Sequence, residues 1–99
     1  LEELDGYVAY ARKIGKPLIV SECCWGAYND AARAELARYN LQEIHKRKIG
    51  FLATSLHHSL QADEHRKEYG PLGWSGNLSF IEANGSLRAF HEFFNDFAD

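Results

Sequence analysis

A glutamate closes the first strongly apolar stretch of the chain. Residues 17–21 form a short apolar run without polar alternation, and Glu22 follows directly. Such a run is typical of a strand that is buried on both faces, as in a parallel sheet. Parallel-sheet enzymes build their active sites at the carboxyl ends of the strands. Glu22 is therefore the first candidate for a catalytic side chain.

A second group of reactive side chains lies between residues 57 and 66. It contains His57, His58, Asp63 and His65, which are residue types that bind zinc or non-haem iron. Adjacent histidines on a strand point to opposite faces, and the spacing matches no strong metal-binding motif. We therefore predict no metal site, and a metal-dependent hydrolase is the less favoured alternative.

The two cysteines of the chain, Cys23 and Cys24, are adjacent. A disulfide between neighbours strains the intervening peptide, and two cysteines do not make a disulfide framework. No partner for a metal site lies nearby in the sequence. We expect both residues to be small, semi-buried side chains beside the end of a strand.

Hydrophobic periodicity predicts the elements that must position these side chains. The expected order is a helix over 3–14, a strand over 17–22, a helix over 31–48, a strand over 51–56, a long loop over 57–76, a small strand over 78–81 and a last helix over 87–97. Cap and turn residues support these boundaries. They are Gly15 and Pro17 after the first helix, Asn29 or Asp30 before the second, Gly50 after it, Asn84 and Gly85 in a turn, and Ser86 before the last helix.

Strands that alternate with helices predict an α/β fold with a parallel sheet. Two parallel strands are too few to stand alone, because both would be edge strands with uncovered faces. The sequence also contains no Met. We therefore expect the chain to be part of a longer protein. Phe90, Phe93, Phe94 and Phe97 are expected to pack as core, and residues 46–48 to form a solvated basic helix end.

The stretch from Lys16 to Gly26 resembles the seventh strand of clan A glycoside hydrolases, retaining (β/α)8-barrel enzymes that include cellulases and mannanases. In that family a Lys-Pro pair, aliphatic residues and a Ser, Thr or Gly precede the nucleophilic Glu, and a small or aromatic residue and Gly follow it. The long helix, the strand after Gly50 and a closing hairpin and helix over 77–97 match the order of the family's last elements. The resemblance implies that residues 1–99 are the C-terminal portion of one TIM-barrel catalytic domain, comprising two βα units and a terminal helix.

This resemblance implies hydrolysis of O-glycosyl bonds with retention, with Glu22 as the nucleophile. A second carboxyl group would act as acid and base, and no cofactor is required. In the family that carboxyl follows an Asn on the fourth strand, and no Asn-Glu pair occurs here. We therefore expect the acid/base residue in a missing N-terminal part of the barrel, and no glycosidase activity from this chain alone.

Four side chains are expected to bind the carbohydrate substrate. Trp25 and Trp74 lie in predicted loops at the active-site rim, and aromatic faces stack on sugar rings. Many family members carry a Trp at the end of the eighth strand, where this chain has Leu56, His57 and His58. Either histidine is a candidate to hydrogen-bond a sugar hydroxyl or the nucleophile. The alternative is a non-catalytic carbohydrate-binding or self-assembling barrel fragment.

Composition excludes several other classes of protein. Hydrophobic residues make up 45% and charged residues 25% of the chain, which are ordinary globular values. A net charge of -3 offers no electrostatic footprint for nucleic acid or an anionic membrane. No apolar run reaches the roughly 18 residues of a membrane-spanning helix. The sequence gives no indication of compartment.

Overall fold

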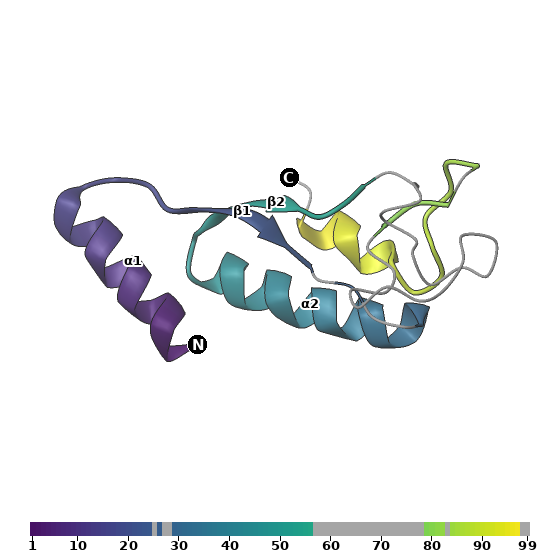
Figure 1. The fold of residues 1–99 in the computed structure, drawn as a ribbon, viewed down its shortest axis with the longest axis horizontal. Helices are drawn as coiled ribbons and strands as arrows, with labels where there is room; N and C mark the ends of the chain where they lie inside the picture. Colours follow the sequence, from purple (N-terminus) through teal and green to yellow (C-terminus); the bar gives the residue numbers. More distant parts are fainter. Residues whose placement is uncertain (25, 27–28, 57–78, 83, 98–99) are drawn as a thin grey trace.

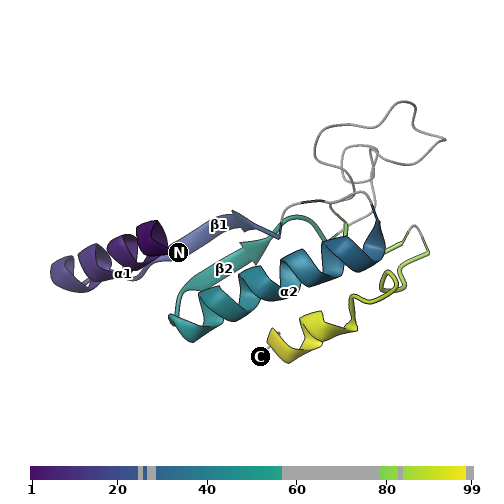
Figure 2. The same ribbon diagram turned by 90° about the horizontal axis from the view of Figure 1, so that it is seen from below.

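The computed structural model describes residues 1–24, 26, 29–56, 79–82 and 84–97. The elements in chain order are α1 (Glu2–Ile14), β1 (Ile19–Cys23), α2 (Asp30–Lys46), β2 (Gly50–Ala53) and the 3-10 helix η2 (Glu92–Phe97). Strands β1 and β2 lie side by side along α2, while α1 projects from one end (Figure 1). Helix η2 packs alongside α2 (Figure 2).

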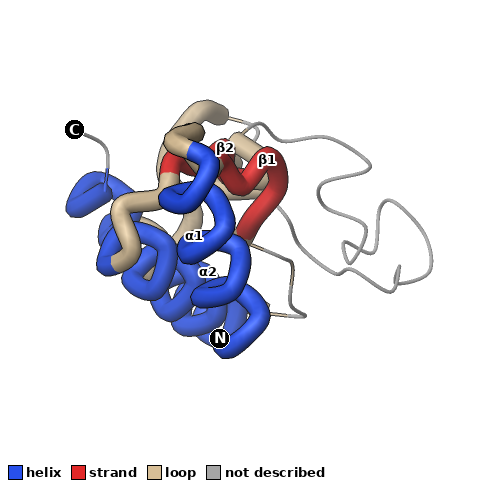
Figure 3. Tube along the Cα trace, turned by 90° about the vertical axis from the view of Figure 1, so that its left-hand side faces the viewer, coloured by secondary structure: helices blue, strands red, loops and turns tan. Residues whose placement is uncertain are grey.

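Strands β1 and β2 are parallel and are joined by α2. The predicted strand–helix–strand unit is therefore present. An end-on view places both strands on one side of the helices (Figure 3). Because parallel strands share a direction, their carboxyl ends meet at one edge of the sheet, and this edge carries the end of β1 with Glu22. The complete barrel needs further strands and remains a prediction.

Helix α2 lies close to the sheet because small residues line its inner face. Ala34, Ala37 and Leu41 are each 1% exposed or less, and the two alanines let the helix backbone approach β1 and β2. Asn29 caps the helix, as predicted, with its side-chain oxygen accepting a hydrogen bond from the Ala32 amide at 2.8 Å. Cys23, Cys24, Ile44, Ile49, Phe80 and Phe93 complete the buried cluster.

The opposite face of the sheet is uncovered in the described part of the chain. Ile19 and Leu52 are 61% and 62% exposed. Their chain neighbours Val20 and Phe51, which pair with each other across the sheet, pack against the core. The alternation follows from the pleat of a strand, which points successive side chains to opposite faces. One face is therefore a packed layer and the other an apolar surface.

Helix α1 ends as the sequence predicts. Gly15 adopts the left-handed conformation at φ 66°, and the amides of Gly15 and Lys16 bond back to the carbonyls of Arg12 and Ala11. A hollow of about 200 Å³ separates α1 from the beginning of β1 and the end of α2. No helix in the described ranges is long and apolar enough to cross a membrane.

The end of α2 differs from the prediction that Gly50 is its C-cap. Lys48 takes the left-handed conformation at φ 57°, and the amides of Lys48 and Ile49 bond to the carbonyls of His45 and Ile44. Gly50 instead begins β2, where its amide donates to the Leu18 carbonyl at 3.1 Å. The helix thus ends at Lys46, four residues before the glycine, and Lys48 takes the left-handed conformation that usually favours glycine.

The predicted last helix over 87–97 is also wrong in its first half. The Asn84 side-chain oxygen accepts hydrogen bonds from the amide and hydroxyl of Ser86, so Ser86 belongs to the turn and caps no helix. Leu87 then forms an antiparallel bridge with Ile81. Only Glu92–Phe97 is helical, as a 3-10 helix. The predicted turn is present, with Gly85 at φ 86°. The small strand expected over 78–81 is reduced to this bridge, and residue 78 lies outside the described residues.

Two packing predictions also need correction. Phe93 is buried and Phe94 and Phe97 pack against the core, but Phe90 is 60% exposed at φ 69°. Its backbone conformation turns the chain before η2 and takes the ring away from the other three. The basic helix end is not wholly solvated either, because the Arg47 side chain is 13% exposed and forms ion pairs with Asp5 and Glu43.

Candidate functional site

Glu22 lies in an irregularity of β1 close to its carboxyl end. Val20 pairs with Phe51 and Cys23 pairs with Ala53. Between these two pairs β1 advances by three residues, whereas β2 advances by two. The extra residue is a β-bulge, a feature that bends a strand and redirects its side chains. Among the described residues β1 pairs with β2 alone, and Glu22 is exposed. The predicted nucleophile is therefore accessible at the sheet edge where β1 ends.

Glu22 borders a hollow of about 250 Å³ between β1, α2 and the start of α1. Tyr39, which is 50% exposed, offers an aromatic ring to the same hollow. Glu43 also borders it and is the second carboxylate there. The remaining lining residues are Leu1, Leu4, Val20, Cys23, Asn40 and Ile44. The hollow thus combines two carboxylates, one aromatic ring and apolar walls.

Glu43 is unsuited to donate a proton. Its carboxylate accepts a hydrogen bond from the Arg47 guanidinium, which is held in turn by Asp5. The guanidinium lowers the pKa of Glu43 and keeps it ionised at neutral pH. A general acid in a glycosidase needs the opposite shift, toward a raised pKa. Glu43 therefore serves the junction between α1 and α2, and the two carboxylates of the hollow do not form an acid–nucleophile pair.

The predicted substrate-binding residues lie outside the described residues. Trp25, His57, His58 and Trp74 belong to this set, as do Asp63 and His65 of the alternative metal site. Within the described ranges, no group of three or more His, Cys, Asp or Glu side chains is placed to hold a metal ion.

Arg33 is a central residue of this edge that the sequence reasoning missed. Its side chain is fully buried, and its Nη2 donates to the carbonyls of Cys24 at 3.0 Å and Thr54 at 3.1 Å. The guanidinium also lies 4.0 Å from the centre of the Phe80 ring. Burial lowers the pKa of Arg33 to about 10, so the group stays charged at neutral pH. One cation therefore ties the carboxyl ends of β1 and β2 to α2.

A second buried arginine anchors the C-terminal hairpin to the start of α2. Arg88 is 4% exposed, and its Nε donates to Asp30 at 2.9 Å. Its Nη1 lies 3.4 Å from the Ser79 hydroxyl and 3.6 Å from the Glu82 carboxylate. Asp30 sits in the first turn of α2, where the helix dipole also stabilises a negative charge. This network holds residues 79–82 and 84–88 beside the strand ends.

His91 is a third buried polar side chain in this region, next to Arg33 and Arg88. Its Nδ1 lies 2.8 Å from the Ala89 carbonyl, which identifies Nδ1 as the protonated nitrogen. The ring packs edge-on against Phe80, with centroids 5.5 Å apart. Burial is the main cause that lowers the pKa of His91, and the charges of Arg33 and Arg88 act in the same direction. His91 is therefore neutral in the folded chain at neutral pH.

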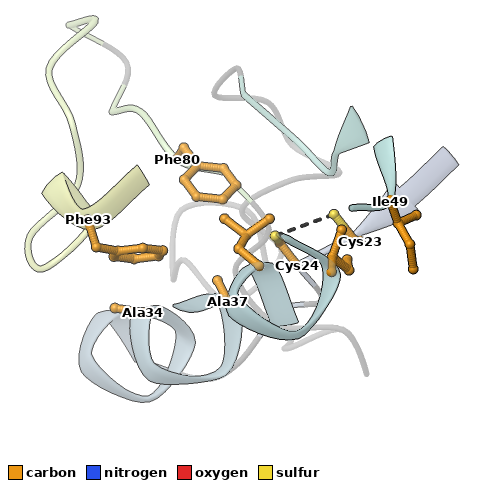
Figure 4. Packing of buried hydrophobic residues seen from close by; sticks show 9 residues of the cluster. Cys23, Cys24, Ala34, Ala37, Ile49, Phe80 and Phe93 are labelled. Carbon is orange, nitrogen blue, oxygen red and sulfur yellow. Dashed lines mark hydrogen bonds between the residues drawn. The ribbon is translucent and has the colours of Figure 1, made fainter. Parts of the chain in front are cut away.

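Cys23 and Cys24 are free thiols at the end of β1, and both are fully buried rather than semi-buried as expected. Their Sγ atoms lie 3.6 Å apart within the core cluster (Figure 4). They separate Glu22 from the loop that follows β1. The candidate nucleophile is therefore anchored to the core through the residue next to it.

Comparisons of the chain with protein-family models, with curated proteins and with solved structures find no match.

Proposed function

We propose that this chain supplies the nucleophile of a retaining glycoside hydrolase, with Glu22 in that role. The observation that carries the proposal is the placement of Glu22: an exposed carboxylate in a bulge near the carboxyl end of a parallel strand. The carboxyl edge of parallel strands is the usual place for catalytic side chains in barrel enzymes. The resemblance of Lys16 to Gly26 to a nucleophile-bearing strand supports the same role.

The proposed reaction proceeds by two displacements. The Glu22 carboxylate attacks the anomeric carbon of the sugar, and the bond to the leaving oxygen breaks as that oxygen receives a proton. Water then gives one proton to the carboxylate that had acted as acid, attacks the same carbon, and releases the sugar and the Glu22 carboxylate. The two inversions retain the configuration at that carbon. Because Glu43 is held ionised by Arg47, we propose that the proton comes from a carboxyl group elsewhere in a complete barrel.

The alternative function is carbohydrate binding without catalysis. The exposed ring of Tyr39 beside Glu22 favours it, because an aromatic face together with a carboxylate acceptor can hold a sugar ring. Binding and nucleophilic attack use the same surface, so an experiment must separate the formation of a covalent bond from simple association.

The first prediction uses a substrate that needs no acid catalyst. Dinitrophenyl 2-deoxy-2-fluoroglycosides carry a leaving group that departs without protonation, and the fluorine slows hydrolysis of the glycosyl-enzyme. We expect the chain to gain the mass of one fluorosugar on the peptide that contains Glu22, with either the gluco or the manno reagent. Intact-mass and peptide-mass spectrometry measure the outcome. Unactivated glycosides should not be turned over by this chain.

Two variants make the test specific. Glu22→Gln should remain unlabelled, whereas Glu92→Gln, which changes an exposed glutamate of η2, should be labelled like the parent chain. Labelling of both variants at another residue contradicts the nucleophile role. A complete absence of labelling, in the parent chain and in both variants, contradicts it as well. Retention of an oligosaccharide on an affinity column without labelling would instead support the carbohydrate-binding alternative.

A further inference from the structure

Cys23 and Cys24 are closer together than neighbours in a regular strand can be. Successive side chains of a strand point to opposite faces of the sheet, yet these two Sγ atoms are 3.6 Å apart. The cause is the backbone of Cys24, the residue after β1, which takes the left-handed conformation at φ 67°. This turn brings the second thiol to the side of the first, and both are buried, at 4% and 0% exposure.

The surroundings give the two thiols different chemical roles. The hydrogen bond with the Cys24 thiol and the nearby charge of Arg33 lower the pKa of Cys23. The same hydrogen bond and burial raise the pKa of Cys24. Thiolates are the attacking species in thiol–disulfide exchange. Cys23 is therefore the attacking thiol, and Cys24 lies within reach of it as the resolving thiol.

We propose that Cys23 and Cys24 form a redox-responsive dithiol that closes to a vicinal disulfide in exchange with a low-molecular-weight disulfide. The Cys23 thiolate attacks one sulfur of the small disulfide in a locally opened state and releases one thiolate. Cys24 then attacks the Cys23 sulfur of the mixed disulfide and releases the second small thiol, and its own proton passes to a released thiolate. Two protein thiols become one disulfide, and one small disulfide becomes two thiols.

Closure changes the end of β1. The Sγ atoms must move from 3.6 Å to about 2.05 Å apart, while Arg33 holds the Cys24 carbonyl at 3.0 Å. The movement is transmitted to Glu22, which is joined directly to Cys23. We therefore expect oxidation to alter the position of Glu22, while Arg33 keeps its hydrogen bond to the Cys24 carbonyl.

The composition of the chain makes the test unambiguous. It contains two cysteines, so a monomer lighter by two hydrogen atoms can hold no other disulfide than Cys23–Cys24. The full chain is equilibrated with mixtures of reduced and oxidised glutathione, once folded and once in guanidinium chloride, and analysed by intact-mass spectrometry after acid quenching. Because the fold has already restricted both side chains, we expect an equilibrium constant for closure at least about tenfold larger in the folded chain.

Single-cysteine variants provide the control. Cys24→Ser should stop at the mixed disulfide with glutathione, and Cys23→Ser should react more slowly, because it keeps the thiol with the raised pKa. An equal or smaller equilibrium constant in the folded chain overturns the proposal. So does the accumulation of mixed disulfides or dimers in the parent chain. These readouts are independent of glycoside chemistry, so a failure here leaves the role of Glu22 to its own test.

Discussion

Arg33 is the residue on which the carboxyl edge of the sheet depends. Its guanidinium, itself fully buried, joins the carbonyls of Cys24 and Thr54 and lies over the face of Phe80. A hydrogen bond from a charged group contributes more than a neutral one, and carbonyls left unsatisfied after its removal add their desolvation cost. The two strand ends and α2 are therefore coupled through one side chain.

Replacement of Arg33 by Met is predicted to destabilise the chain strongly. Met keeps most of the length and apolar bulk but loses both hydrogen bonds and the contact of the charge with Phe80. We expect the free energy of unfolding to fall by about 3 kcal/mol, measured by urea denaturation followed by circular dichroism. Arg38→Met is the matched control on the same helix. The Arg38 side chain is 40% exposed in its ion pair with Glu35, and its guanidinium lies 5.3 Å from the centre of the Phe93 ring, so its loss should cost about 1 kcal/mol. Similar losses in both variants would refute the special role of Arg33.

The sequence contained an indication that the Arg33 side chain is buried, but no indication of the groups to which it donates hydrogen bonds. Arg33 precedes Ala37 by four residues and Leu41 by eight, so it lies on the apolar stripe of the predicted helix. A charged residue on such a stripe indicates a buried ion or hydrogen-bond donor. Its acceptors are main-chain carbonyls from two distant segments, and main-chain groups leave no mark in a sequence. The position of Glu22 near the end of a strand was easier to predict, because the apolar run that forms the strand directly precedes it in the sequence.

At the scale of elements, local signals predicted α1 and α2 to within two residues. Their apolar periodicity is long and their ends carry cap residues. The last helix failed because its signals compete: the phenylalanines have helical spacing, but Asn84 engages Ser86 and Leu87 pairs with Ile81. The pairing of Leu87 with Ile81 forms across the turn. Hydrophobic periodicity describes the spacing of residues within one segment, so it cannot predict such a pairing.

One glycine inside α1 and one at its C-cap give opposite predictions for the same substitution. Gly15→Ala places a side chain at φ 66°, so we expect a loss of about 1 kcal/mol. Gly6→Ala lies inside the helix with nothing within 4 Å of the new Cβ, and a gain of about 0.5–1 kcal/mol is expected. Helical circular dichroism and urea denaturation of both variants measure the difference. Equal effects of the two substitutions would mean that Gly15 does not hold the left-handed conformation in solution.

At the scale of the whole chain, stability should depend on pH through His91. Its pKa is lowered below the ordinary 6.5 by burial, so the folded chain keeps His91 neutral while the unfolded chain takes up a proton. Stability is then complete above the ordinary pKa and is lost as pH falls toward the lowered one. We expect the free energy of unfolding to decrease between about pH 7 and about pH 5. Asp5 and Glu43 have lowered pKa values and lose their ion pairs only in more acidic solution.

The source of this pH dependence can be assigned with two variants. His91→Phe should flatten the decrease between these pH values, because it replaces the ring without a titratable group. His45→Gln changes an exposed histidine and should keep the slope of the parent chain. A decrease that persists unchanged in His91→Phe would place the titrating group elsewhere.

The bulge in β1 has a consequence for how separate molecules meet. An edge strand with a regular row of amides and carbonyls is a template on which further chains can stack into fibrils. In β1 the extra residue interrupts that row, and the exposed carboxylate of Glu22 places a negative charge beside it. Two such edges repel each other and cannot align in register, so the same irregularity that presents Glu22 to solvent disfavours edge-to-edge pairing of β1 between molecules.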